Sequence, residues 1–288
     1  MAFSSVHEMI DLCKESGKPL YEVILESDLA ESGLTRAESE AEMHRLWAVM
    51  QATSDGYCGA DRSMSGFAGG DAAKVNAAAA RGVLYADGYF ADVMAEALKT
   101  AECNACMKRI VAAPTAGACG VLPAVLLPCA RHFSLSREQL VQALYVASGF
   151  GMVIAARASI SGAEGGCQAE IGSAAAMAAP ALVHLRGGTP SMMAHACAMA
   201  VKNLLGLVCD PVGGLVEVPC VKRNVIGAMD ALSAAQMALA GIESRVPPDQ
   251  VLDAMAEVGR SLPPSLRETG KGGLAATPFG MAYAPKEG

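Results

Sequence analysis

The stretch LVQALYVASGFGMVIAARASI, residues 140–160, is the least polar part of this chain of 288 residues, and its pattern indicates the class of fold. It has the length of a membrane-spanning helix. However, polar residues and glycines interrupt it: Gln142, Ser148, Gly149, Gly151 and Arg157. A buried helix pair, or one helix with a break, therefore fits the stretch better than a membrane span does, and we expect no membrane role.

Helix signals extend along the sequence on both sides of this stretch. Ser5 with Glu8, and Thr35 with Glu38, have the spacing of capping boxes, which satisfy free backbone groups at a helix start. The apolar residues behind the second cap recur at helical spacing: Met43, Leu46, Trp47 and Met50. Further helices are predicted at about 88–112, 121–131, 136–158, 170–186, 190–206, 222–243 and 247–259. Only residues 215–221 resemble an extended segment, so we predict an all-α fold with glycine-rich loops.

Composition supports this fold class. Hydrophobic residues make up 52% of the chain but aromatic residues only 5%, so Ala, Val, Leu and Met supply most of the apolar surface. That mixture suits closely packed helices. Because no linker or internal repeat divides the sequence, we predict one multi-helix globular domain over residues 1–288, with the helical region 1–56 packed on it.

The negative charge lies in the N-terminal region. Residues 1–56 contain 11 acidic and 4 basic residues, an excess that accounts for the whole formal charge of −7. The rest of the chain has no basic stripe that would neutralise a row of phosphates, so nucleic-acid binding is not expected. The N-terminus lacks the basic start and apolar middle of a signal peptide, and we predict a cytoplasmic protein.

Ten cysteines in a reducing compartment are not expected to form a disulfide framework, which leaves burial, catalysis or metal binding. Cys103 and Cys106 form a CxxC pair. The residues around them read as continuous helix, and no second CxxC completes a four-thiolate zinc site. We interpret this pair as structural thiols.

Three other cysteines lie in segments that contain glycine or proline: Cys167 in SGAEGGCQ (161–168), and Cys209 and Cys220 in CDPVGGLVEVPC (209–220). Such segments can turn backbone N–H donors towards sulfur, as the thiolate ligands of a cluster require. Three thiolates without a nearby fourth suit a four-iron cluster in which one iron stays open. The spacing leaves two alternatives, a zinc site and three unrelated buried thiols.

Five motifs follow one another along the chain: SMSGFAGGDAAK (63–74), AAPTAGACGVLPA (112–124), SGAEGGCQAEIG (161–172), LGLVCDPVGGLVEVPC (205–220) and RETGKGGLAATP (267–278). Together they resemble the α chain of the bacterial iron–sulfur-dependent L-serine dehydratase family. The resemblance implies a mainly helical catalytic region and a 4Fe–4S cluster held by Cys167, Cys209 and Cys220, with one open iron. It also implies a β chain as partner and L-serine as the substrate, converted to pyruvate and ammonia by elimination of water.

The same glycine-rich motifs supply candidate residues for the substrate pocket: Ser63, Ser65, Gly66, Thr115, Gly117, Ser161, Gly162 and Glu164. Serine and threonine hydroxyls also cap helices routinely, which is the alternative role for these side chains. Lys74 is a candidate catalytic base, although a lysine at that place could instead bind the substrate carboxylate. We also hypothesise that the β chain supplies the base. Glu217 and Lys222 depart from the glutamine and glutamate that are more usual in the family.

Three other functions are weighed against the dehydratase. A related cluster enzyme would act on L-cysteine and release sulfide in place of water. A zinc-stabilised helical interaction protein would use the same cysteines without catalysis. A pyridoxal-phosphate dehydratase is disfavoured, because no lysine lies in a convincing Schiff-base setting.

Overall fold

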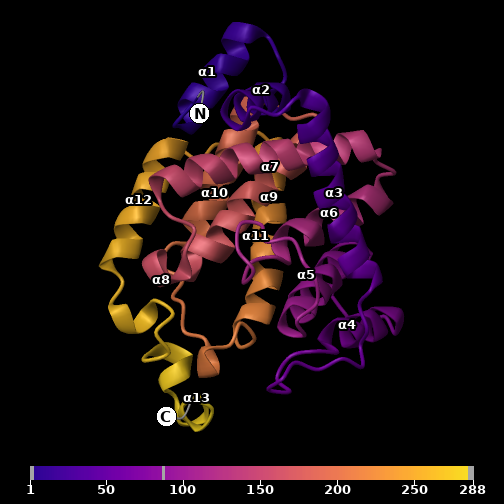
Figure 1. Cartoon of the computed structure of the whole chain (residues 1–288), viewed down its shortest axis with the longest axis vertical. Coiled ribbons are helices and arrows are strands. Elements are labelled where there is room, and N and C mark those ends of the chain that lie inside the picture. The colour runs from indigo at the N-terminus through magenta and orange to yellow at the C-terminus, as the bar shows by residue number, and fades with distance from the viewer. Residues whose placement is uncertain (1–2, 86–87, 285–288) are drawn as a thin grey trace.

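A computed structural model describes residues 3–85 and 88–284 of the chain (Figure 1). The helices in the first half are α1 (Val6–Ser16), α2 (Leu20–Ser32), α3 (Arg36–Asp55), α4 (Asp71–Ala80), α5 (Tyr89–Ala105) and α6 (Val121–His132). Those in the second half are α7 (Arg137–Arg157), α8 (Gly162–Gly165), α9 (Ser173–Leu185), α10 (Pro190–Leu204), α11 (Cys220–Leu239), α12 (Pro248–Ser261) and α13 (Pro278–Ala282). A π-helix covers Gln168–Gly172, and 3-10 turns cover Val212–Gly214, Pro264–Leu266 and Gly273–Ala276. No strand is found within these residues, which confirms the predicted all-α fold.

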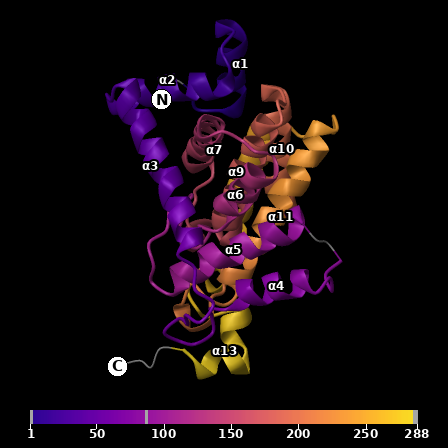
Figure 2. The same ribbon diagram turned by 90° about the vertical axis from the view of Figure 1, so that its right-hand side faces the viewer.

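Helix α9 lies at the centre of the fold and packs against α6, α7, α10 and α11 (Figures 1 and 2). Every residue from Ser173 to Val183 is buried, and most of them are alanines. Alanine has a high helix propensity and lets neighbouring helix axes approach closely. The small-residue composition noted in the sequence therefore serves the innermost helix.

The N-terminal helices pack on this core through apolar residues. The Ser5 hydroxyl accepts a hydrogen bond from Glu8 N (3.0 Å), and Thr35 with Glu38 forms a complete capping box, as predicted. The buried residues that join α1 and α3 to the main core include Val6, Met9, Trp47 and Met50. The acidic residues of this region lie mostly on the outer faces of these helices.

Helix α7 is continuous, so the predicted break in residues 140–160 is wrong. Its glycines make room for neighbouring helices and do not interrupt it. A Cβ atom at Gly149 would lie 2.4 Å from Ile24 Cδ1 of α2, and one at Gly151 would lie 2.9 Å from Met177 Cε of α9. Close packing on both sides offsets the low helix propensity of glycine.

By length and composition alone, α7 is the one helix in the described residues that is apolar enough to cross a membrane. However, 67% of its most apolar 18-residue stretch is buried inside the protein. Core helices of globular proteins pass the same test, so this helix is weak evidence for a membrane span.

Two predicted element boundaries are corrected by the structure. Helix α5 ends at Ala105 and does not reach residue 112, because Met107 adopts a positive φ of 61° and Lys108 N bonds back to Cys103 O (2.9 Å). Residues 215–221 do not form an extended segment: Val221 N bonds to Glu217 O (3.0 Å), and the helical turn of α11 begins there. Cys220 is thus the first residue of a helix and not a loop residue.

Asp230 of α11 gives a testable pH dependence. Burial raises the pKa of its carboxyl from 3.8 to about 6, although the hydrogen bond from Asn203 Nδ2 (2.6 Å) opposes the shift. The folded state therefore holds a proton that the unfolded chain releases, and stability falls as the pH rises from about 4 to about 6. We expect Asp230→Asn to stabilise the protein by about 1–2 kcal/mol at neutral pH. Thermal unfolding at about pH 4 and about pH 7 checks this, since the gain should vanish at the lower pH.

Candidate metal centre and substrate pocket

Three elements of the fold bring the predicted ligand cysteines together. Cys167 lies between α8 and the π-helix, Cys209 follows α10 in an irregular segment, and Cys220 begins α11. Their exposed fractions are 3%, 3% and 8%, respectively. The π-helix after Cys167 is a rare element that is often found at functional sites.

The three thiols are close enough to influence one another's ionisation. Burial is the main cause that raises the pKa of Cys209, and the charge of Cys167 is the next. Burial and the charge of Cys167 likewise raise the pKa of Cys220 to about 12. Burial raises the pKa of Cys167 to about 11, although the Arg223 guanidinium opposes the shift. The thiols are therefore neutral until a bound cation replaces their protons.

The arrangement of the cysteines tests what kind of metal group fits. Within residues 3–85 and 88–284, no three His, Cys, Asp or Glu side chains are placed to hold a single metal ion. In a four-iron cluster each thiolate binds a different iron, so the ligand sulfurs stand farther apart than those around one zinc ion. The three buried thiols share one environment, and this is the donor type that a cluster requires.

The C-terminal segment holds Cys209 in place by its backbone. Cys209 N donates to Leu266 O (2.9 Å), and Glu268 N donates to Cys209 O (2.8 Å), so Cys209 and Arg267 form an isolated parallel bridge. The motif at residues 267–278 therefore acts as a support for the Cys209 segment, which lies beside it in the lower part of Figure 1.

Asp210 and Arg223 extend this support, and the sequence assigned them no role. Asp210 is buried and accepts a hydrogen bond from Leu274 N (2.9 Å) of the C-terminal segment. Arg223 forms an ion pair with Asp210 (2.9 Å) and donates to Val208 O (2.7 Å). A Cβ atom at Gly273 would lie 2.4 Å from Asp210 Oδ2, so this position requires glycine.

Two buried amide side chains connect the cysteine segments to their neighbours. Gln168 accepts a hydrogen bond from Gly206 N (2.9 Å) and donates to Met255 O (2.9 Å), which joins the Cys167 segment to the one before Cys209. Asn224 accepts from Gly120 N (2.8 Å) and donates to Gly117 O (2.8 Å) and Cys220 O (2.9 Å). Such fully bonded side chains fix the backbone around the site.

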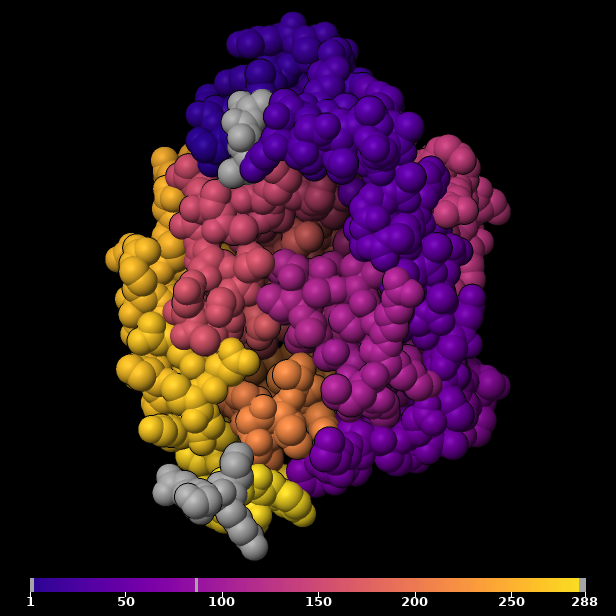
Figure 3. Space-filling model, in the orientation of Figure 1, coloured from indigo at the N-terminus to yellow at the C-terminus, as the bar shows by residue number. Residues whose placement is uncertain are grey.

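The predicted pocket residues Thr115, Gly117 and Gly162 meet at Glu170, a residue that the sequence did not single out. Thr115 Oγ1 donates to Glu170 Oε1 (2.7 Å). A Cβ atom at Gly117 would lie 3.2 Å from Oε1, and one at Gly162 would lie 2.7 Å from Oε2 and 3.1 Å from the Cys209 sulfur. In Figure 3 the magenta, salmon and orange parts of the chain border a recess in the surface. The sequence feature that could have identified Glu170 is its position three residues after Cys167 in the same motif.

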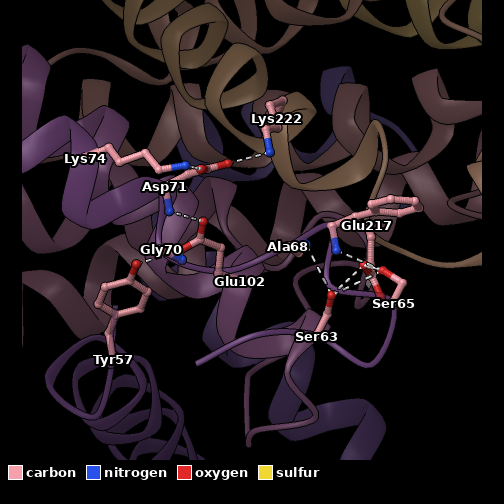
Figure 4. Close-up of polar contacts among 11 residues, drawn as sticks. Tyr57, Ser63, Ser65, Ala68, Gly70, Asp71, Lys74, Glu102, Glu217 and Lys222 are labelled. Carbon is pink, nitrogen blue, oxygen red and sulfur yellow. Dashed lines mark hydrogen bonds and ion pairs between the residues drawn. The ribbon is translucent and has the colours of Figure 1, made fainter. Parts of the chain in front are cut away.

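Ser63 and Ser65 meet at a second carboxylate, that of Glu217 (Figure 4). Ser63 Oγ donates to Glu217 Oε2 (2.6 Å), and Ser65 Oγ donates to the same oxygen. Both hydroxyls also accept backbone bonds within their own turn, from Ala68 N (3.1 Å) and Phe67 N (3.0 Å). Glu217 is buried and does not face solvent; it anchors the 63–68 turn to the segment between Cys209 and Cys220.

Lys74 lies apart from both groups of residues. Its side chain is 77% exposed, and its ammonium pairs with Asp71 (2.8 Å), which Lys222 also contacts (2.5 Å) (Figure 4). Glu102 stabilises the start of α4 beneath this triad, where it accepts bonds from Asp71 N (2.7 Å) and Tyr57 OH (2.7 Å). Lys222 therefore takes part in a surface ion pair, and not in contacts with the buried cysteines.

The other predicted pocket residues have varied positions. Gly66 has a positive φ of 81° and completes the serine turn through a bond from its N–H to Ser63 O (3.0 Å). Ser161 precedes α8, and its side chain makes no capping bond there. Glu164 is exposed and accepts a hydrogen bond from Ser159 Oγ (2.5 Å). These three residues are not joined to Glu170 or Glu217 by any hydrogen bond in the described residues.

The CxxC cysteines lie in different surroundings. Cys103 is buried in α5 and its thiol faces Thr53 O (3.7 Å), whereas Cys106 follows the last residue of that helix. Burial raises the pKa of Cys103 to about 11. These properties suit a buried structural thiol.

The fold and the site define a helical protein with a buried three-cysteine centre next to a carboxylate pocket. The profile of the family described as "Serine dehydratase alpha chain" matches residues 15–275. This chain belongs to that family.

Curated relatives support the assignment over nearly the full chain. It is 46% identical to the probable L-serine dehydratase, alpha chain, of Bacillus subtilis, with 99% of this chain and 95% of the relative aligned. It is 41% identical to the L-serine dehydratase, alpha chain, of Peptoniphilus asaccharolyticus, with 96% of each aligned. L-serine dehydratase 2 of Escherichia coli is 38% identical over 95% of this chain, which spans 61% of that longer protein.

Proposed function

We propose that this chain is the cluster-binding α chain of an L-serine dehydratase, which converts L-serine to pyruvate and ammonia. The observation that carries the proposal is the convergence of three buried thiols and the Glu170 pocket in a chain of the serine dehydratase alpha chain family. In the reaction, L-serine loses its α-proton and its β-hydroxyl as water. The resulting aminoacrylate tautomerises to an imine, which water hydrolyses to pyruvate and ammonia.

We assign the cofactor as a 4Fe–4S cluster held by Cys167, Cys209 and Cys220. When bound, a cluster with one open iron supplies a Lewis acid for the departing hydroxyl. The chain's own residues exclude water from the thiols and place Glu170 beside Cys209. Because the iron–sulfur chemistry needs reduced thiols, we also propose a cytoplasmic location.

The catalytic base is proposed to come from a β chain. Two relatives are named alpha chains, and an alpha chain implies a partner of another type. Lys74, the candidate within this chain, is exposed, and its ammonium is already paired with Asp71, so it is not placed to take a proton from a substrate in the pocket. A β chain that docks over the pocket would bring the base and exclude solvent at the same time.

Anaerobic purification followed by iron, sulfide and pyruvate assays tests the proposed function. We expect about four iron and about four acid-labile sulfide per chain, and pyruvate formation from L-serine that rises strongly when the β chain is added. One zinc per chain and no pyruvate would favour the interaction protein. Faster pyruvate and sulfide release from L-cysteine would favour the desulfidase. Equal turnover of serine with and without the β chain would refute the assignment of the base.

A further inference from the structure

The Glu170 carboxylate lacks a positively charged partner. Its Oε1 atom accepts one hydrogen bond, from Thr115 Oγ1 (2.7 Å). In the described part of the chain, no other donor reaches the carboxylate, and no lysine, arginine or histidine nitrogen lies within ion-pair distance of it. The Oε2 atom is therefore free to accept a hydrogen bond from a ligand.

The surroundings of this carboxylate favour a cation. Burial raises the pKa of Glu170, and the negative charge of Glu268 acts in the same direction. Glu170 is partly buried, and a carboxylate that is partly removed from water gains when a cationic donor takes up its free oxygen. The guanidinium of Arg223, which lies close to the cysteines, is already paired with Asp210 and bonded to Val208 O.

Two glycines pack closely against the Glu170 carboxylate. A Cβ atom at Gly162 would lie 2.7 Å from Glu170 Oε2 and 3.1 Å from the Cys209 sulfur, so the Gly162 backbone lies against both the carboxylate and a proposed cluster ligand. A Cβ atom at Gly117 would approach the other oxygen to 3.2 Å. Glu170 is only partly buried, and its Oε2 atom is not among the enclosed polar atoms that lack a partner, so a small ligand can reach Oε2 from the solvent side with Cys209 close by.

We propose that Glu170 is the binding site for the α-ammonium group of the amino-acid substrate. Glu170 Oε2 accepts the ammonium hydrogen bond, while Thr115 holds Oε1 and fixes the carboxylate plane. The β-carbon of the substrate then lies on the side of Cys209. This inference rests on the proposed function, because it assigns one group of the proposed substrate to one side chain.

The subsite makes the pocket selective for amino acids over hydroxy acids. An ammonium group pairs with the carboxylate, whereas a hydroxyl at the same carbon brings no charge to the partly buried anion. Glu170 is thus a specificity-determining residue that contacts the substrate, and it is distinct from the base that removes the α-proton.

Binding of L-alanine and L-lactate to the cluster-loaded protein tests the subsite. The two ligands differ only in the ammonium or hydroxyl group on Cα, and neither carries the β-hydroxyl that leaves, so calorimetry measures binding without turnover. In Glu170→Gln, where the amide still accepts the Thr115 bond, we expect L-alanine to bind about 10- to 100-fold more weakly. L-lactate should change by less than about 3-fold. The KM for L-serine should rise by a factor similar to the loss of L-alanine affinity. The iron content per chain should stay as in wild type.

Two further variants complete the test. Glu257→Gln, an exposed residue of α12, is the matched control and should leave both ligands unchanged. Glu170→Asp keeps the charge and should keep the preference for L-alanine over L-lactate. If Glu170→Gln loses its iron, the comparison of Glu170→Asp with wild type takes its place as the test. An equal loss of both ligands, or no loss of L-alanine, in a variant that retains its iron would overturn the ammonium subsite. Wild-type protein that makes no pyruvate from L-serine would instead refute the proposed function.

Discussion

Cys209→Ser is expected to lose its iron and to form no measurable pyruvate from L-serine. Removal of a residue that only supports a metal ligand already costs about 10- to 100-fold in affinity or activity, so loss of a ligand should cost more than about 100-fold. Cys209 is 3% exposed and held by backbone bonds to Leu266 and Glu268. The backbone therefore cannot shift to bring a serine hydroxyl, which has a shorter bond to iron than sulfur has, within reach of the cluster. Cys167→Ser and Cys220→Ser should behave alike.

Iron and acid-labile sulfide analysis, with the absorption spectrum, measures this result without relying on activity. Cys103→Ser is the matched control, because Cys103 is 2% exposed but lies in α5 among other contacts. It should retain about four iron per chain. A full cluster in any one of the three ligand variants would remove that cysteine from the ligand set.

Gly162→Ala should lower kcat/KM for L-serine by at least about 100-fold while the protein stays folded. The added Cβ would lie 2.7 Å from Glu170 Oε2 and 3.1 Å from the Cys209 sulfur, which is too close for both. Because Cys209 is fixed by its backbone bonds, the Glu170 side chain has to move, and it then occupies the space proposed for the substrate. A displacement of this size at a reacting site is enough for the expected loss.

Gly172→Ala provides the control for this change. Gly172 lies in the same motif, and its Cβ atom would meet only Leu204 and Gln168 at 3.8 and 3.9 Å. We expect its kcat/KM to stay within about 3-fold of wild type. Steady-state pyruvate assays, circular dichroism and iron content should be measured for both variants. Equal activity of Gly162→Ala and wild type would show that the space beside Glu170 is not used by the substrate.

The helical fold was largely predictable because its signals are local. The capping box at Thr35 and the stripe through Trp47 are read within a few residues; the structure has the capping box and buries Trp47 and Met50 of the stripe. The predicted break in residues 140–160 is wrong because the contacts that keep this helix continuous come from residues that are distant in the sequence. Gly149 and Gly151 look like helix breakers in sequence, but Ile24 and Met177 fill the space that they leave. Those neighbours come from other helices, so no local pattern reports them.

The sequence by itself determined the all-helical class and pointed to Cys167, Cys209 and Cys220 as a group with a shared role. Only the tertiary structure decided that Glu170 lies between Thr115 and Gly162, that Glu217 is buried beneath two serines, and that Lys74 points to solvent. Helix periodicity depends on neighbours three and four residues apart, whereas a pocket is made by segments that are distant in the chain. Packing of α9, α10 and α11 brings those segments together, and it thereby turns separate glycine loops into one site.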